Sequence, residues 1–223
     1  MQFVYDEKAG APILTIEGEN YKYLFRVRRS KLGSIIDFRN LQNENIYHYK
    51  VVHIDKKSAT LELLLAEKKS VTAKKELMLG WCIIDPKNIE KVLPTLNEIG
   101  VSKIVFIKCA YSQANFKIKK ERLLKILINS SQQCGRSNLM EIEFCSSLYS
   151  FLQKYPQSFL LHFGNNLLSE KKSAINSIVV GCEGGFSKDE IELFEENKIV
   201  GFDSSLILKS ESAAIAAASM ILL

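Results

Sequence analysis

From Glu76 onward, short apolar runs alternate with amphipathic runs, and this alternation limits the possible folds more than any other feature of the chain. The apolar runs are rich in β-branched and aromatic residues, which predicts buried strands. They are residues 77–84, 103–107, 158–163 and 177–180. The amphipathic runs 86–99 and 119–134 predict helices, the first of which stops at Gly100. Strands separated by helices form βαβ units, so the sequence predicts an α/β domain with a parallel sheet.

The first ~68 residues have a different pattern, with short β-rich runs separated by turn residues. These runs are residues 3–5, 13–16, 34–38, 47–54 and 59–65. Such spacing predicts a small barrel, interrupted by one helical segment at residues 20–27. Residues 68–75 are polar and rich in lysine, which is typical of a linker.

The net charge of +5 comes entirely from the N-terminal third of the chain. Residues 1–75 hold 14 Lys and Arg against 9 Asp and Glu, whereas residues 76–223 hold 16 of each kind. Such an asymmetry indicates a nucleic-acid partner, although a solvated lysine-rich surface would have the same composition.

Neither a membrane segment nor a cysteine-based site is predicted. No apolar run reaches the ~18 residues of a membrane span, and the N-terminus has no signal-peptide pattern. The five cysteines are odd in number and widely spaced, so we expect neither a disulfide framework nor a zinc site. A reducing, cytoplasmic location is therefore expected. His48 and His53 have no partners at metal-ligand spacing, and no serine lies in a G-x-S-x-G elbow, so no metal and no hydrolytic triad is expected. His162 ends an apolar run and is either a core-edge residue or a neighbour of a ligand.

A glycine-rich segment, Gly181-Cys182-Glu183-Gly184-Gly185-Phe186-Ser187, joins the apolar run 177–180 to an acidic amphipathic run. Ser187 and Glu190 have the spacing of a capping box, which marks a helix start. The segment lacks the lysine of a P-loop and the spacing of a dinucleotide-binding loop. It is therefore either a tight strand-to-helix turn or a loop whose backbone approaches a ligand.

Three further segments allow two interpretations each. Arg136 follows a predicted helix end at Gly135, where it would bind a phosphate or base edge or lie solvated on the surface. In residues 21–29, Tyr and Phe alternate with Arg, which suits RNA but also a packed helix with solvated arginines. The last segment, 210–223, is rich in small residues and predicts a buried core helix or a subunit-interface helix, with Ile215, Ser219 and Leu222 on one face.

Five segments resemble motifs of one family, in the same order along the chain. They are residues 24–29 with Gly33 (H-L-x-x-V-L-R-x-x-x-G-D), 97–101 (T-E-L-G-V), 132–136 (E-Q-S-x-R), 181–190 (G-P-E-G-G-[FL]-[ST]-x-x-E) and 204–213 (G-x-R-I-L-R-x-E-T-A). This is the RsmE family of bacterial ribosomal RNA methyltransferases, which methylate N3 of one uridine in 16S RNA with S-adenosylmethionine.

The resemblance implies a two-domain fold, S-adenosylmethionine as the cofactor, 16S RNA as the partner and a role in ribosome biogenesis. It implies a PUA-like RNA-binding β-barrel over residues 1–70 and a SPOUT methyltransferase domain with a trefoil knot over residues 74–223. It also implies a cytoplasmic homodimer that contacts itself through the C-terminal domain. The cofactor would lie against three loops, at Leu161, His162, Gly181, Glu183, Gly184, Gly185, Leu206, Ile207 and Leu208.

The resemblance also implies residue roles. Arg136, Glu183 and Glu211 are the expected catalytic residues, with Arg136 beside the uracil oxygens or a phosphate and one of the glutamates as proton acceptor. The expected RNA contacts are Arg26, Arg28, Arg29, Arg136 and Lys209.

The chain differs from the family pattern at several of these positions. Cys182 replaces proline, Gln132 replaces glutamate, and Leu206 and Lys209 replace arginines. The loss of arginines leaves two other functions open, namely a non-catalytic RNA-binding protein on the same scaffold and a methyltransferase for another RNA.

Overall fold

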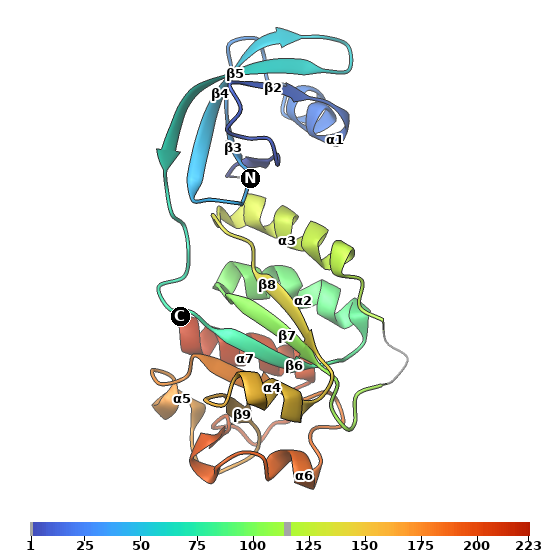
Figure 1. Ribbon diagram of the computed structural model, residues 1–223, viewed down its shortest axis with the longest axis vertical. Coiled ribbons are helices and arrows are strands. Elements are labelled where there is room, and N and C mark those ends of the chain that lie inside the picture. Colours follow the sequence, from blue (N-terminus) through green and yellow to red (C-terminus); the bar gives the residue numbers. More distant parts are fainter. Residues whose placement is uncertain (1, 114–116) are drawn as a thin grey trace. The chain divides into compact units, whose positions relative to one another are not determined.

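The computed structural model describes residues 2–113 and 117–223 and divides into two compact units (Figure 1). The N-terminal unit comprises Met1–Thr72 and Ile128–Leu139, and the second unit comprises Ala73–Leu127 and Met140–Leu223. The chain therefore passes between the units three times. The domain bounds 1–70 and 74–223 stay a prediction, and nothing in the sequence pattern indicated the return of Ile128–Leu139 to the first unit.

The N-terminal unit contains a five-stranded sheet in the order β1-β3-β4-β5-β2. β1 pairs with β3 in parallel, and the other pairings are antiparallel. The strands are β1 Val4–Tyr5, β2 Ile13–Ile16, β3 Ile35–Arg39, β4 Asn45–Ile54 and β5 Ala59–Lys68. All five lie on the predicted β-rich runs. Their inward side chains form a core that includes Leu14, Ile16, Phe38, Tyr49, Val51 and Leu61.

The predicted helical segment of this unit is confirmed and begins earlier than expected. Helix α1 spans Gly18–Tyr21 and continues as a π-helix, η1, over Lys22–Val27. Tyr21 and Leu24 are buried in the core, which holds the helix on the sheet. The amide of Ser30 donates to the carbonyl of Leu24, and Arg29 takes a left-handed conformation with a φ of 57°. Glycine usually occupies that position after a helix, so an arginine there is unusual.

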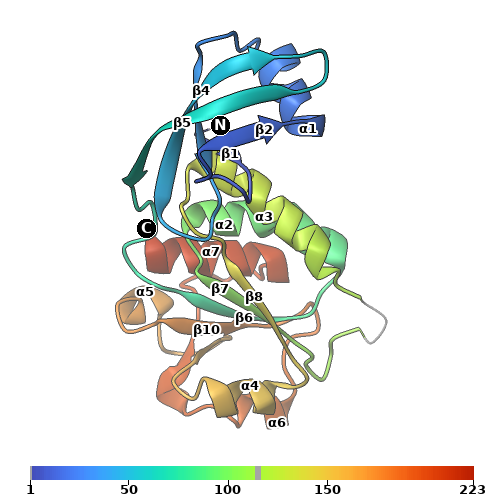
Figure 2. The ribbon, with the colours of Figure 1, turned by 45° about the horizontal axis from the view of Figure 1, so that its top comes forward.

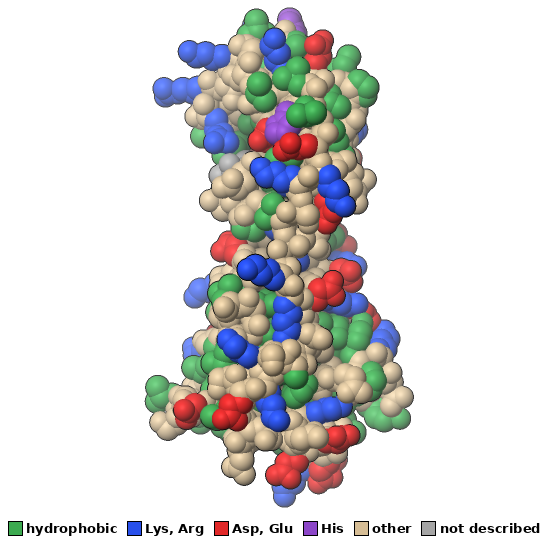
Figure 3. Space-filling model, turned by 90° about the vertical axis from the view of Figure 1, so that its left-hand side faces the viewer, with side chains coloured by type: hydrophobic (Ala, Val, Ile, Leu, Met, Phe, Trp, Pro, Cys, Tyr) green, Lys and Arg blue, Asp and Glu red, His purple; other side chains and the backbone are tan. Residues whose placement is uncertain are grey.

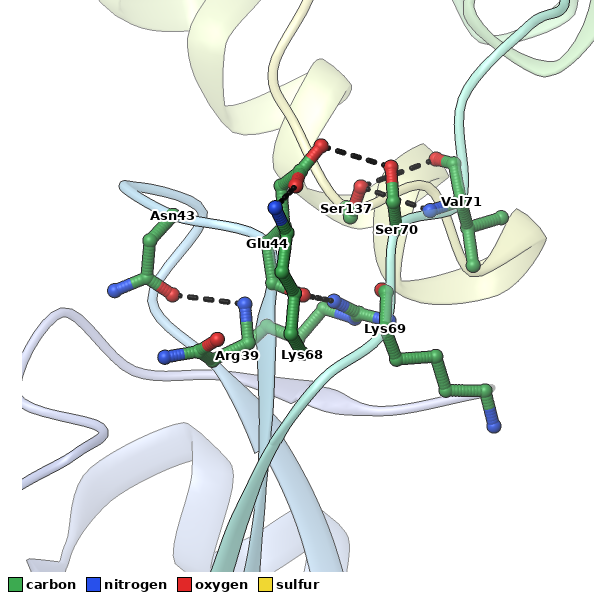
Figure 4. Close-up of polar contacts among 9 residues, drawn as sticks. Arg39, Asn43, Glu44, Lys68, Lys69, Ser70, Val71 and Ser137 are labelled. Carbon is green, nitrogen blue, oxygen red and sulfur yellow. Dashed lines mark hydrogen bonds and ion pairs between the residues drawn. The ribbon is translucent and has the colours of Figure 1, made fainter.

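A buried arginine fixes the end of this sheet (Figure 4). Arg39 is 1% exposed, and its guanidinium lies 5.5 Å from the ring centre of Phe3. It donates to the backbone carbonyls of Glu44 at 3.1 Å and Lys69 at 2.8 Å. Glu44 also accepts from the hydroxyl of Ser70 at 2.8 Å. The residues that leave β5 are therefore tied to the barrel before the chain enters the second unit.

Residues of the returning segment complete the N-terminal unit. Gln132 lies near the end of helix α3, which spans Lys120–Cys134. Its carbonyl accepts from the amide of Gln2 at 2.7 Å, and its side-chain Oε1 accepts from the amide of Tyr5 at 2.8 Å. Ser137 bonds to both the amide and the carbonyl of Val71. The segment that carries the predicted motif at 132–136 thus supports the first strand of the barrel.

The second unit is built on a six-stranded sheet in which every pairing is parallel (Figure 2). Its order is β11-β9-β10-β6-β7-β8. The strands are β6 Met78–Cys82, β7 Lys103–Ile107, β8 Glu141–Cys145, β9 Phe159–Leu161, β10 Ser177–Val180 and β11 Ile199–Val200. This sheet confirms the predicted α/β class. β8 and β11 are edge strands that the sequence analysis did not identify.

Helices cover both faces of this sheet. Helices α2 and α7 pack together on one face and α4 lies on the other (Figures 1 and 2). The helices are α2 Pro86–Ile99, α3, α4 Leu148–Lys154, α5 Leu168–Lys171, α6 Lys188–Ile191, the short 3-10 helix η2 Glu196–Lys198 and α7 Ser210–Leu222. α2 has the predicted bounds because Asp85 accepts from the amide of Lys87 and Gly100 ends the helix with a φ of 110°.

The C-terminal helix α7 buries its alanines. Ala214, Ala217 and Ala218 are fully buried and Ile221 is nearly so. The face expected from Ile215, Ser219 and Leu222 is only half-buried in the described structure. Three alanines and Ile221 therefore face the core, and the small side chains let α7 approach its neighbours closely.

Two cysteines of the second unit form a disulfide, contrary to the expectation from their spacing. It joins Cys82, at the end of β6, to Cys109, just after β7, at a separation of 27 residues. β6 and β7 are neighbouring parallel strands, so their ends bring the two residues together. Spacing alone could not reveal this proximity. Within the described ranges, no helix is long and apolar enough to cross a membrane.

Candidate functional site

A cavity of about 480 Å³ opens in the second unit where three of the parallel strands end. Its walls come from the loops that follow β9, β10 and β11. Ligands of open α/β sheets commonly bind outside the carboxyl ends of the strands. Eight of the nine residues predicted to bind the cofactor line this cavity. They are Leu161, His162, Gly181, Glu183, Gly185, Leu206, Ile207 and Leu208.

The glycine loop is tightly packed, and each of its three glycines is needed for a different structural reason. A Cβ on Gly181 would lie 3.0 Å from the ring of Phe186, and one on Gly184 would lie 2.8 Å from the Cβ of Tyr111. Gly185 has a φ of +70°, which side chains disfavour. Gly184 itself does not line the cavity, so its role in the loop is close packing against the segment after β7.

The predicted capping box is present at the end of this loop. The hydroxyl of Ser187 accepts from the amide of Glu190 at 3.2 Å, and the carboxylate of Glu190 accepts from the amide of Ser187 at 3.0 Å. The other oxygen of Glu190 accepts from the amide of Ala110 at 2.8 Å. Glu190 therefore holds the glycine loop to the segment after β7, in addition to starting the short helix α6.

Ser210 links the first turn of α7 to the same loop. Its hydroxyl donates to the carbonyl of Gly181 and accepts from the indole Nε1 of Trp81 at 2.9 Å. Ser210 and Trp81 are both buried. One hydroxyl thus joins β6, the glycine loop and α7. The sequence analysis placed Ser210 at a helix start but assigned it no role.

The cavity wall is mostly neutral. Burial lowers the pKa of His162, so its imidazole is uncharged at neutral pH, and burial also raises the pKa of the Cys182 thiol. Glu183 and Lys209 are the charged residues among those that line the cavity, and both are exposed. Such a wall suits a ligand with a large uncharged part and a few polar groups.

The three predicted catalytic residues do not meet in this cavity. Glu183 lines it, whereas Glu211 lies half-exposed in the first turn of α7 and is not part of the wall. Arg136 belongs to the N-terminal unit, is 6% exposed, and donates from Nε to Asn138 at 2.9 Å. The roles of these three residues stay predictions.

The predicted RNA contacts lie on both units. Arg26, Arg28 and Arg29 are exposed on and just after η1, and Lys209 is exposed at the cavity. Lys and Arg side chains project from several places on the face of the N-terminal unit that Figure 3 shows. The four basic residues are therefore open to a partner, unlike the buried Arg136.

Comparison with known proteins identifies the family. A profile of the RNA methyltransferase domain matches residues 71–222, and one of the RNA methyltransferase PUA domain matches residues 16–64. The ribosomal RNA small subunit methyltransferase E of Helicobacter pylori (strain ATCC 700392 / 26695) is 43% identical over 99% of both chains. The chain belongs to the ribosomal RNA small subunit methyltransferase E family. The family member from Aquifex aeolicus is 28% identical over 99% of this chain and 98% of its own.

Solved structures share the fold of this chain. A ribosomal RNA small subunit methyltransferase E from Neisseria gonorrhoeae, bound to S-adenosyl methionine, superposes with a TM-score of 0.78 at 18% identity over 98% of this chain and 95% of its own. A putative methyltransferase of Legionella pneumophila with bound cofactor SAM gives 0.80 at 22% identity over 99% and 96%. These similarities confirm the α/β fold with a PUA-like N-terminal part.

Proposed function

We propose that this protein transfers the methyl group of S-adenosylmethionine to N3 of one uridine in the 16S RNA of the small ribosomal subunit. The 43% identity over nearly the whole chain to a ribosomal RNA small subunit methyltransferase E supports this proposal most strongly. The cavity adds to it, because the three loops expected to hold the cofactor form one concave site.

The cavity fits the proposed cofactor in size and polarity. A volume of about 480 Å³ lies within the range of ligand sites, and its neutral wall suits an adenosine group. Gly181, Gly185 and Leu206–Leu208 would hold the cofactor through backbone groups and apolar contacts. The cofactor supplies an electrophilic methyl group, and the protein supplies position and electrostatics.

The protein has to manage one proton and one developing charge. Uridine N3 carries a proton at neutral pH and becomes nucleophilic when that proton leaves. Glu183 is the carboxylate of the cavity wall and the first candidate to accept the proton, with Glu211 as the second. Lys209 at the wall, or Arg136, would stabilise the negative charge that develops on the uracil oxygens.

The wider biological setting is proposed with the reaction. The protein would act in ribosome biogenesis in the cytoplasm, as a homodimer joined through its C-terminal domain. That domain would be a SPOUT domain over residues 74–223 with a trefoil knot, preceded by an RNA-binding domain over residues 1–70. Arg26, Arg28, Arg29, Arg136 and Lys209 would contact the RNA.

The decisive experiment incubates the purified protein with labelled S-adenosylmethionine and unmethylated small subunits, and then identifies the modified nucleoside. Label in 3-methyluridine supports the proposal. Cofactor binding without label would indicate another RNA substrate, and neither binding nor label would indicate a non-catalytic RNA-binding protein. Parallel single-turnover rates of Glu183→Gln and Glu211→Gln distinguish the two candidate proton acceptors, because only the true acceptor loses most of its rate.

A further inference from the structure

The tip of the β4–β5 hairpin presents two adjacent lysines that the sequence motifs do not include. Asp55, Lys56, Lys57 and Ser58 connect the two strands, and the amide of Asp55 donates to the carbonyl of Ser58 at 2.8 Å. Lys56 and Lys57 are both exposed. A short, closed turn of this kind keeps the two ammonium groups together at the end of a long two-stranded ribbon.

Helix α1 and its continuation η1 hold this hairpin tip in place. The buried Tyr21 at the end of α1 donates from its hydroxyl to the carbonyl of Asp55 at 2.6 Å. Arg26 of η1 reaches the carbonyl of Lys56 with its Nη2 at 3.5 Å. The two lysines of the hairpin and the arginines of the helix therefore belong to one continuous surface of the N-terminal unit.

The charges of this surface are not neutralised by neighbouring carboxylates. Glu19 is paired with Lys22 at 2.8 Å, and Asp55 lies 3.2 Å from His53. Among the ion pairs of the described residues, none involves the five basic side chains of the surface. They are Arg26, Arg28, Arg29, Lys56 and Lys57.

The backbone beneath these side chains is unusual in two ways. η1 is a six-residue π-helix, a form that is rare and often found at functional sites. Arg29 occupies a left-handed position at φ 57°, where a glycine would cost less. Arg28 lies over the ring of Tyr23, with 5.8 Å between its guanidinium carbon and the ring centre. The arginines of this unusual backbone segment, Arg26, Arg28 and Arg29, are all exposed.

We propose that Lys56 and Lys57 of the hairpin tip, together with Arg26, Arg28 and Arg29, form one phosphate-binding surface for RNA, and that Tyr21 positions the tip. This inference rests on the proposed RNA substrate but adds a second chain segment to the contact. Five basic side chains that take part in no ion pair among the described residues outnumber the one carboxylate of the tip, Asp55, and match the phosphate groups of a nucleic-acid backbone.

The test measures the affinity of the full-length protein for a small-subunit RNA fragment at several salt concentrations. We expect Lys56→Ala with Lys57→Ala to reduce the slope of log K against log salt by about 1 to 2, because each lost phosphate contact removes about 0.7 to 0.9. Binding in 0.1 M salt should weaken roughly three- to tenfold. The control is Lys171→Ala with Lys172→Ala, which removes the same charge from exposed positions of the second unit.

A double-mutant cycle tests the positioning role of Tyr21. Tyr21→Phe should weaken RNA binding in the parent and have no further effect once Lys56 and Lys57 are alanine. Equal and additive losses in both backgrounds would mean that Tyr21 acts only on the fold, and would overturn its assignment.

Two outcomes overturn the surface itself. A salt slope of the Lys56 and Lys57 variant equal to that of the parent would exclude phosphate contacts at the tip. An equal loss in the control would show that only net charge matters. Because these experiments measure binding, they are independent of methyl transfer, so a protein that methylates but keeps its slope refutes this inference and leaves the proposed function intact.

Discussion

Ser210 offers the sharpest test of how the candidate site is held together. Replacing it with alanine removes one hydroxyl that serves both the indole of Trp81 and the carbonyl of Gly181. Trp81 is fully buried, whereas Gly181 lines the cavity, so the indole N–H is the group left without an acceptor; an unsatisfied buried polar group costs about 1–3 kcal/mol. We therefore expect Ser210→Ala to lower the free energy of unfolding of the second unit by about 1–3 kcal/mol.

The same substitution should weaken the proposed cofactor site. Gly181 lines the cavity, so a glycine loop released from α7 spends less time in the arrangement that surrounds a ligand. If a tenth of the molecules keep that arrangement, the measured affinity falls about tenfold. Isothermal titration with S-adenosylmethionine measures this loss, and urea unfolding measures the loss of stability.

The chain supplies both a probe and a control for this experiment. Trp81 is the one tryptophan of the sequence, so its fluorescence reports on the altered hydrogen bond itself. Ser212→Ala removes an exposed hydroxyl from the same helix and should change little. If Ser210→Ala unfolds at the same urea concentration as Ser212→Ala, the reasoning is refuted.

Three other substitutions test separate contacts. Gly184→Ala should bind S-adenosylmethionine about tenfold more weakly in titrations, because overpacking against Tyr111 costs about 1–3 kcal/mol; an unchanged affinity would contradict this. Hydrogen bonds from Lys103 and then Lys154 lower the pKa of Glu143 to about 2. The stability that the ionised carboxylate contributes is therefore complete above about pH 4.5 and is lost as the pH falls towards 2. The urea midpoint of Glu143→Gln should lie below that of the parent above about pH 4.5, and the difference should disappear as the pH approaches 2. Arg39→Met should lower the free energy of unfolding by about 1–3 kcal/mol in urea unfolding, because two partly buried carbonyls lose their charged donor; an unchanged midpoint would contradict this.

Local signals predicted many of the elements of this fold. Pro86 and Gly100 marked the two ends of α2, and the β-branched run 177–180 marked β10. β8 was missed although Glu141–Cys145 alternates polar and apolar residues, because the run is short and lies at a sheet edge. Propensity is a weaker guide at such edges, where pairing on one side decides the strand.

Only the parts of the candidate site that lie in recognisable motifs were predictable from the sequence. The three loops were placed by their resemblance to a family, and eight of their nine residues line one cavity. The contacts that hold these loops were not predictable, because they join residues far apart in the sequence. Ser210 meets Trp81 across 129 positions, and Glu190 meets Ala110 across 80. A single sequence does not contain the information that such residues are neighbours.

Gln132 has a consequence for how this protein can be cut or recombined. Its carbonyl and side chain accept from the amides of Gln2 and Tyr5, and Ser137 bonds to Val71. Gln132 and Ser137 belong to the segment Ile128–Leu139, which returns to the N-terminal unit after the chain has left it at residue 72. A gene fragment that stops at residue 72 would keep the pairing of β1 with β3 but lack the acceptors of the Gln2 and Tyr5 amides. Exchanging domains at residue 72 would leave both units incomplete, so residues 1–72 do not form an independent module. Substitutions in the first strand have to stay compatible with the end of α3.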